Sequence, residues 1–261
     1  MTRWSGVLQA LLGSRRDWRL EVPRRPRAPM PGLHWLGPIA VLASVVAVWP
    51  AFSGAVGEEG DAAFALYIGA VSITLMAWSF VLAIRIRLLE PLFGGLDRMY
   101  RLHRWCGVFA IVAMFLHTQL DPELERGIRG AGEGLADAAQ ELAGIAEIVL
   151  YVLVGVSLLR WLPSRYWRWT HKLLGIPYAF ACFHFYTAEK TFENGSGYGI
   201  WFATMMIVGL VAYVLRVGVK DAVLKGRRYR IREMHPGQDA TELRLEPVGR
   251  AIRHRAGQFV F

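Results

Sequence analysis

The chain has 261 residues, of which 54% are hydrophobic and 12% are Trp, Tyr or Phe, a composition typical of an integral membrane protein rather than a soluble one. Its formal net charge of +9 fits membrane topology and anionic lipid headgroups, whereas nucleic-acid binding would require a basic patch on a soluble domain and is not expected. The two cysteines, Cys106 and Cys182, lie in apolar stretches without metal-ligand spacing, which predicts small buried residues and no disulfide framework.

Residues 1–32 are predicted to form a cytoplasmic N-terminal segment. Apolar residues recur at helical spacing between Trp4 and Leu12 and arginines follow them, a pattern that favours a helix lying in the membrane interface. A disordered basic tail explains the same residues equally well. A proline-rich linker at 23–32 leads into the first apolar stretch, and the region does not resemble a cleavable signal peptide.

Six apolar stretches follow, each long enough to cross a hydrocarbon core of ~30 Å as a helix. They are predicted at about 33–52, 63–86, 102–120, 144–162, 167–186 and 199–219. The sequence therefore predicts an all-α integral membrane fold, a six-helix transmembrane domain over residues 33–220, with both termini on the same side.

The segments that flank and connect these stretches differ in positive charge. Lys and Arg number 23 in the segments 1–32, 85–104, 160–172 and 216–232, but only 3 in the segments 53–62, 120–143 and 187–198. By the positive-inside rule, both termini are predicted to be cytoplasmic. We therefore expect a multi-pass protein of the cell (plasma) membrane, with the lipid bilayer as its first partner.

Two of the six stretches each carry two histidines, which are costly at bilayer depth unless something binds them. The third holds His103 and His117, and the fifth holds His171 and His184. Both stretches run from inside to outside, so His103 and His171 share one depth and His117 and His184 share another. At 1.5 Å per helical residue, the two levels lie ~20 Å apart.

Paired imidazoles at two depths predict two b-type haems. Haem iron needs two axial ligands beyond its porphyrin, whereas zinc usually needs three or four protein ligands, and the sequence supplies no further donor at either level. The alternatives are capped core histidines or a proton relay, and neither explains the matched pairs. The other histidines have no partner at the same depth: His34, His235 and His254.

The fifth stretch cannot be a straight ideal helix if both of its histidines face one partner. Thirteen residues leave His184 about 140° from His171, whereas fourteen bring His117 to within about 40° of His103. Pro177 is predicted to kink this helix and to realign part of that angle. Gly107 and Gly175, four residues after the inner histidines, would leave room for a macrocycle or simply allow close helix packing.

Cations near the inner pair are candidate contacts for haem propionates, although ordinary positive-inside anchoring also accounts for them. They are Arg98, Arg101, Arg104, Arg168 and Lys172. The tryptophans beside them are predicted to form an interfacial belt: Trp105, Trp167 and Trp169. On the other side, the acidic loop 121–144 is expected to form a short amphipathic cap over the outer haem, with Arg126 and Arg129 as its candidates for attracting an anionic acceptor or product.

The histidine pattern resembles the ferric reductase-like transmembrane domain shared by NADPH oxidases and cell-surface ferric reductases. The resemblance covers residues 33–220 and is carried by the spacing of His103/His117 and His171/His184, and by the segments LDRMYRLHRWCG and WRWTHKLLG. It implies two haems held between the third and fifth helices. It also implies an oxidoreductase that passes electrons from cytoplasmic NAD(P)H through FAD and both haems to an extracellular acceptor, either oxygen, giving superoxide, or ferric iron.

The C-terminal segment 226–261 reads as three short strands, RRYRIREMHPG, ATELRLEPVG and HRAGQFVF, and resembles the opening of a flavin-binding barrel. We expect this chain alone to lack complete flavin and nicotinamide sites, which a cytoplasmic domain beyond residue 261 or a separate flavoprotein would supply. A haem-only cytochrome b subunit fed by quinol or a separate flavoprotein remains an alternative, as does a non-redox transporter.

Overall fold

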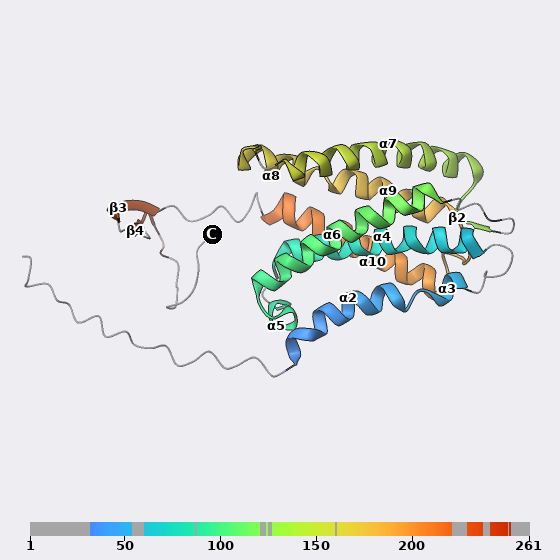
Figure 1. Ribbon diagram of the computed structural model, residues 1–261, viewed down its shortest axis with the longest axis horizontal. Helices are drawn as coiled ribbons and strands as arrows, with labels where there is room; N and C mark the ends of the chain where they lie inside the picture. The colour runs from blue at the N-terminus through green and yellow to red at the C-terminus, as the bar shows by residue number, and fades with distance from the viewer. Residues whose placement is uncertain are drawn as a thin grey trace, which may run out of the picture. The chain divides into compact units, whose positions relative to one another are not determined.

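The computed structural model describes residues 32–53, 60–86, 88–120, 124, 127–159, 161–220, 229–236, 241–249 and 251. They fall into two units, a helical one within residues 29–225 and a β-hairpin within residues 226–261 (Figure 1). The interfacial helix expected near Trp4 lies outside the described residues, as do Arg126, His254 and the third expected strand.

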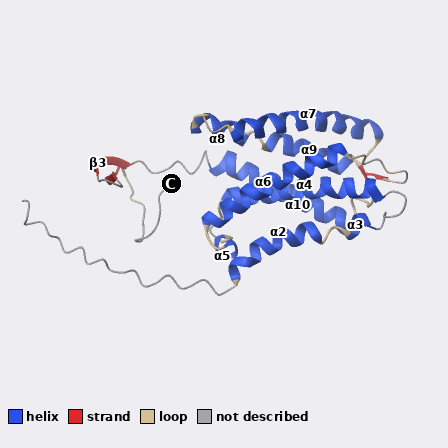
Figure 2. Cartoon of the chain, in the orientation of Figure 1, coloured by secondary structure: helices blue, strands red, loops and turns tan. Residues whose placement is uncertain are grey.

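The helical unit is made up mainly of helices (Figure 2). In chain order these are η1 (Leu33–Trp35), α2 (Leu36–Val46), α3 (Pro50–Ser53), α4 (Gly60–Ile84), α5 (Glu90–Phe93), α6 (Leu96–Gln119), α7 (Glu133–Leu158), α8 (Ser164–Lys172), α9 (Gly175–Thr187), α10 (Gly197–Val214) and the π-helical turn η2 (Leu215–Lys220). Two short strands, β1 (Ile128–Arg129) and β2 (Glu189–Lys190), pair antiparallel.

Among the described residues, four helical stretches are long and apolar enough to cross a membrane: Leu33–Ser53, Gly60–Ile84, Glu133–Leu158 and Gly197–Gly218. They correspond to the first, second, fourth and sixth predicted stretches. The third corresponds to α6, whose charged and polar residues, including two histidines, make it less apolar than these four. The fifth is divided between α8, of 9 residues, and α9, of 13, and each is too short to cross a membrane alone. Four candidate spans are therefore observed, and the count of six stays a prediction.

Helix α4 lies at the centre of the helical unit, packed against α6 and α10 (Figure 1). Its packed faces are rich in small residues, and Ala63, Ala65 and Ala77 have no exposed surface. Small side chains let helix backbones approach closely, which is the usual basis of helix association in membranes. By contrast, large apolar side chains such as Phe109 of α6 and Ile148 of α7 are exposed, as expected of surfaces that face lipid.

The fifth predicted helix is interrupted, as its histidine spacing required, but the break precedes Pro177 rather than occurring at it. Helix α8 ends at Lys172 and α9 begins at Gly175. Pro177 is then the third residue of α9, where its missing N–H costs nothing because the first turn of a helix has no internal acceptors for such groups. Gly175 lies directly against the ring of Tyr213 in α10, so at this position the glycine allows close helix packing.

The connections at the β1–β2 end of the bundle are joined to one another. Besides the strand pairing, the Asn194 amide donates to the carbonyls of Gly130 (3.1 Å) and Tyr186 (3.0 Å). The Thr191 hydroxyl donates to the Ala51 carbonyl at 2.7 Å. The described part of loop 121–144 contains β1 and the first turns of α7, which starts at Glu133; its role as a cap over the outer haem stays a prediction.

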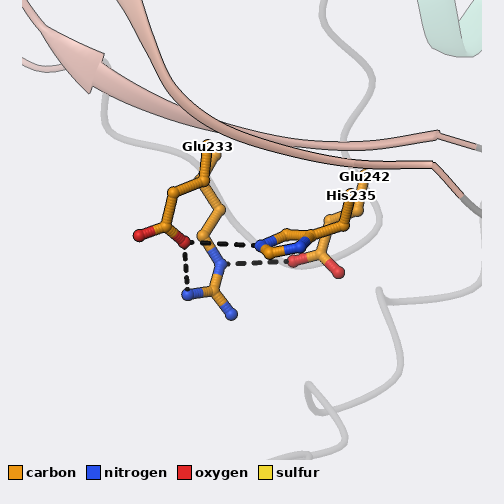
Figure 3. Close-up of polar contacts among 4 residues, drawn as sticks. Glu233, His235 and Glu242 are labelled. Atoms are coloured by element: carbon orange, nitrogen blue, oxygen red, sulfur yellow. Dashed lines mark hydrogen bonds and ion pairs between the residues drawn. The ribbon is translucent and has the colours of Figure 1, made fainter.

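The C-terminal unit is an antiparallel hairpin of β3 (Tyr229–Pro236) and β4 (Thr241–Pro247), with an irregularity between Ile231 and Glu233. These strands confirm the first two predicted there; the flavin barrel stays a prediction. On one face, the Glu233 carboxylate accepts from Arg244 at 3.0 Å and lies 3.4 Å from the His235 ring (Figure 3). The hydrogen bond from His235, followed by the charge of Arg244, lowers the pKa of Glu233.

Candidate functional site

His103 of α6 is held by the backbone of α4. Its Nδ1 atom lies 2.9 Å from the Ser79 carbonyl oxygen and 2.9 Å from the Ser79 hydroxyl. A carbonyl oxygen can only accept, so Nδ1 carries the proton and Nε2 is left with a free lone pair. This is the arrangement that metal-ligating histidines commonly show, with the second ring nitrogen donating to a backbone carbonyl.

His117, fourteen residues later on α6, is held in the same way. Its Nδ1 donates to the Ala65 carbonyl of α4 at 2.8 Å. The ring fits there because residue 69, one helical turn further along α4, is a glycine: a Cβ at Gly69 would lie 2.9 Å from Nδ1 of His117. Both histidines of α6 therefore have their Nε2 atoms available and their rings oriented by α4.

His171, near the end of α8, is oriented by an aromatic ring instead. Trp167 stacks on it with ring centroids 4.9 Å apart and planes 12° from parallel. The Trp167 indole in turn donates to the Ser157 carbonyl of α7 at 3.1 Å. The Nδ1 atom of His171 is buried without a hydrogen-bond partner, which leaves this imidazole with unsatisfied polar capacity inside the helical unit.

The rings of His103 and His171 are neighbours, with their centroids 6.1 Å apart and their planes at 76°. A metal–imidazole bond is ~2.0 Å and a ring nitrogen lies ~1.1 Å from the ring centre, so two axial ligands on opposite sides of one iron place their ring centres ~6 Å apart. The first predicted pair therefore fits the spacing of bis-histidine haem ligation.

The second pair, His117 and His184, lines a common cavity of ≈ 180 Å³ between α4, α6, α7 and α9. Its walls include Gly69 of α4, Gly144 of α7 and Lys190 of β2. Around it, α6 packs mainly on α4, whereas α9 packs mainly on α7. The structure thus brings together the members of both predicted pairs, each with one histidine from α6 and one from the α8–α9 segment.

The chemistry of the donor set also suits haem. Within the described ranges, no group of three or more His, Cys, Asp or Glu side chains is close enough to hold a metal ion. Two imidazoles are therefore what each level offers, which matches the axial requirement of haem and falls short of a zinc site. Gly107 of α6 has open space where its Cβ would be, consistent with room beside the first pair.

The cations predicted to contact haem propionates do not gather around His103 and His171. Arg101 pairs with Asp97 at 3.3 Å on an exposed face, Arg104 and Arg168 are exposed, and the Lys172 ammonium lies over the ring of Trp169 at 5.1 Å. Arg98 and Arg101 line a separate pocket of ≈ 340 Å³ together with His34. A role toward propionates therefore stays a prediction for these cations.

Four residues of the site were not predicted from the sequence. Ser79 and Gly69 resemble ordinary small residues of an apolar helix, and Trp167 was expected in an interfacial belt rather than stacked on His171. Lys190 was visible only as the single cation of segment 187–198. The sequence signal that could have located the support of His117 is the pair of small residues Ala65 and Gly69, which lie one helical turn apart on the face of α4 that α6 packs against.

A comparison with known families gave a match that overlaps this site. Residues 68–182 match the model of a family described as "Ferric reductase like transmembrane component". The match begins within α4, contains His103, His117 and His171, and ends two residues before His184. A comparison with curated proteins gave no match. The match confirms the predicted resemblance and, with the four apolar helices, indicates a multi-pass membrane oxidoreductase of transmembrane electron transfer.

Proposed function

We propose that this chain, whose residues 68–182 carry a ferric reductase-like transmembrane domain, moves electrons across the membrane through two b-type haems. His103 and His171 would hold the inner haem, and His117 and His184 the outer one. Helix α6 is then the third of six spans, and α8 with α9 forms the fifth. Both termini are cytoplasmic in this proposal, as the distribution of Lys and Arg predicts.

The observation that carries this proposal is the orientation of the α6 histidines. Each donates its Nδ1 proton to a carbonyl of α4, at 2.9 Å for His103 and 2.8 Å for His117, so each presents Nε2 away from α4. For the inner pair, the 6.1 Å between ring centroids adds the spacing that two axial ligands need. Ordinary core histidines would satisfy one nitrogen without placing a second imidazole opposite the other.

When bound, each haem supplies one-electron chemistry by cycling between ferric and ferrous iron. The residues of this chain fix the imidazole orientations through Ser79, Ala65 and Trp167, and keep the sites within an apolar environment. Separations of fourteen and thirteen residues place the two sites ~20 Å apart along the membrane normal, so that together they cover most of its hydrocarbon core.

The donor and the acceptor belong to the same proposal. Cytoplasmic NAD(P)H would deliver electrons through FAD, and the antiparallel strands β3 and β4 support a flavin domain because they are the first elements expected of one. Two histidine ligands leave haem iron no open position, so the extracellular acceptor, oxygen or chelated ferric iron, would take the electron at the haem edge. Ferric iron is here a substrate and not a resident metal.

The pairing can be tested by removing one ligand at a time from the membrane-embedded chain. We expect two b-type haems by reduced-minus-oxidised spectroscopy and haem extraction. His103→Ala and His171→Ala should each leave the same single haem, with the same spectrum and midpoint potential, and His117→Ala and His184→Ala should each leave the other. His34→Ala is the matched control and should retain both. Absence of b-type bands, or a pattern of loss that does not follow the pairs, would refute the proposal.

The direction of transfer needs the full-length enzyme with its flavin domain. In His184→Ala, NADPH should still reduce the inner haem in a stopped-flow measurement, while transfer to an extracellular acceptor stops. In His171→Ala, the remaining outer haem should be slow to reduce with NADPH, although dithionite still reduces it. The reverse result, with haem content verified in both variants, would invert the assigned topology.

A further inference from the structure

Lys190 is a buried cation at the β1–β2 end of the bundle. Its residue is only 3% exposed, although it belongs to a connecting strand. The ammonium donates to the carbonyls of Tyr186 (3.2 Å) and Ala188 (3.0 Å), and it lies 5.9 Å from the centre of the Phe185 ring. Pairing of β2 with β1, where Lys190 is opposite Ile128, covers it from outside.

No carboxylate of the described residues pairs with this ammonium. Within the described part of the chain, no Asp or Glu oxygen lies within 4.0 Å of its Nζ atom. The neighbouring Glu189 pairs instead with Arg129, at 3.7 Å. Glu147 of α7 lines the same cavity without reaching ion-pair distance. Among the described residues, the positive charge of Lys190 is therefore offset by backbone dipoles and an aromatic ring.

Burial alone lowers the pKa of Lys190 to about 8. The side chain is thus mostly protonated at neutral pH. An uncompensated buried charge acts over longer distances than an exposed one, because protein and lipid screen it less than water does. Since Lys190 lines the same cavity as His117 and His184, its field falls on the outer haem site.

We propose that Lys190 raises the reduction potential of the outer haem. The inference rests on the proposed function, because it requires a haem between His117 and His184. Reduction adds one negative charge to the site, and a nearby fixed cation stabilises that reduced state. By stabilising the reduced outer haem, Lys190 would favour electron transfer from the inner haem to the outer one.

The described cations near the inner site are all less buried than Lys190. Arg85, Arg101, Arg104 and Arg168 are exposed, and Arg101 is already paired with Asp97; Lys172 is half-buried, with its ammonium over the Trp169 ring. Water and counterions screen such charges. Lys190 consequently acts on one haem and not on both, and this selectivity distinguishes electrostatic tuning from a general loss of structure.

The test is a spectroelectrochemical titration of both haems in the membrane-embedded chain, comparing Lys190→Gln, which keeps donors but removes the charge, with Lys190→Arg, which keeps the charge. Lys190→Gln should lower the one-electron reduction constant of the outer haem by about tenfold, which is ~59 mV, and leave the inner haem unchanged. Lys190→Arg should retain the wild-type potential. A His171→Ala background, which keeps the outer haem alone, assigns the two transitions.

Arg165→Gln is the control for loss of a positive charge, because Arg165 is exposed with its guanidinium over the Tyr166 ring, and it should shift neither potential. Equal shifts in both haems, equal effects of Gln and Arg at position 190, or an equal effect of Arg165→Gln would overturn the inference. Two bound haems with unchanged potentials in Lys190→Gln would refute it while the proposed function stands. A protein without haem would refute both.

Discussion

A single methyl group added at Gly69 should impair haem binding at the outer site and leave the inner site intact. In Gly69→Ala the added Cβ would lie 2.9 Å from Nδ1, 3.0 Å from Cε1 and 3.1 Å from Cγ of His117. Carbon atoms in van der Waals contact are ~3.5–4.0 Å apart, so the ring must retreat by ~0.5 Å or more. Helix α4 is continuous around Gly69 and its backbone cannot move aside without disturbing its packing on α6 and α10.

A retreat of this size exceeds what a metal–ligand bond tolerates, which is ~0.2 Å. It also strains the 2.8 Å hydrogen bond from His117 to the Ala65 carbonyl. Loss of such a supporting interaction usually costs ~10–100-fold in metal affinity, or ~1.4–2.7 kcal/mol. We therefore expect Gly69→Ala to lose most of its outer haem and to retain the inner one, so that haem per protein falls from two toward one.

The assay is haem content by pyridine haemochrome, with a redox titration to identify the haem that remains. Gly155→Ala on α7 is the matched control, since nothing lies within 4 Å of its added Cβ, and it should keep both haems. Alanine is a better helix former than glycine, so a loss in Gly69→Ala cannot be attributed to a weaker helix. Wild-type content and potentials of both haems in Gly69→Ala would show that the reasoning about His117 is wrong.

Three further predictions concern the surroundings of the histidines. Trp167→Leu removes the ring stacked on His171 and should weaken the inner haem several-fold, from ~0.5–1.5 kcal/mol of aromatic contact, whereas Trp161→Leu, at a position 77% exposed, should not change haem titration. Ser79→Ala removes a hydroxyl but leaves the carbonyl that accepts from His103, so its inner-haem dissociation rate should rise less than that of Trp167→Leu. Because the pKa of Lys190 falls from 10.5 to about 8 on folding, the unfolded chain binds more protons between these values, and wild-type stability should rise as pH increases through this window. At pH 7 the haem-free Lys190→Met chain should therefore be more stable than the haem-free wild type by ~1–2 kcal/mol. The full pKa shift corresponds to ~3 kcal/mol, which solvent screening reduces. The difference, measured by thermal unfolding, should vanish near pH 10.

Much of the site was predictable because histidine is rare and costly in an apolar helix. The spacing within each helix gave the depth of His103, His117, His171 and His184, and charge in the loops gave an expected direction for the chain. Their supports were not predictable. A glycine such as Gly69 occurs in membrane helices for many packing reasons, and only its contact with His117 shows its role here.

The same limit explains the helix break and the buried lysine. Pro177 is a strong local signal for an interruption, but the observed break precedes it at a place where Gly175 packs on Tyr213, a contact between different helices. The burial of Lys190 depends on pairing with Ile128, 62 residues earlier in the chain. Local sequence patterns carry no information about such distant pairings.

The division of one predicted helix into α8 and α9 makes the two sides of the site unequal in their tolerance of length changes. His103 and His117 belong to a single uninterrupted helix, α6, in which an inserted residue between them would rotate one ligand by ~100° relative to the other. His171 and His184 belong to separate helices joined by Leu173 and Leu174, whose amides make turn-type hydrogen bonds to residues three positions earlier. We therefore expect an inserted residue at this join to disturb the ligand pairs less than one inserted between His103 and His117.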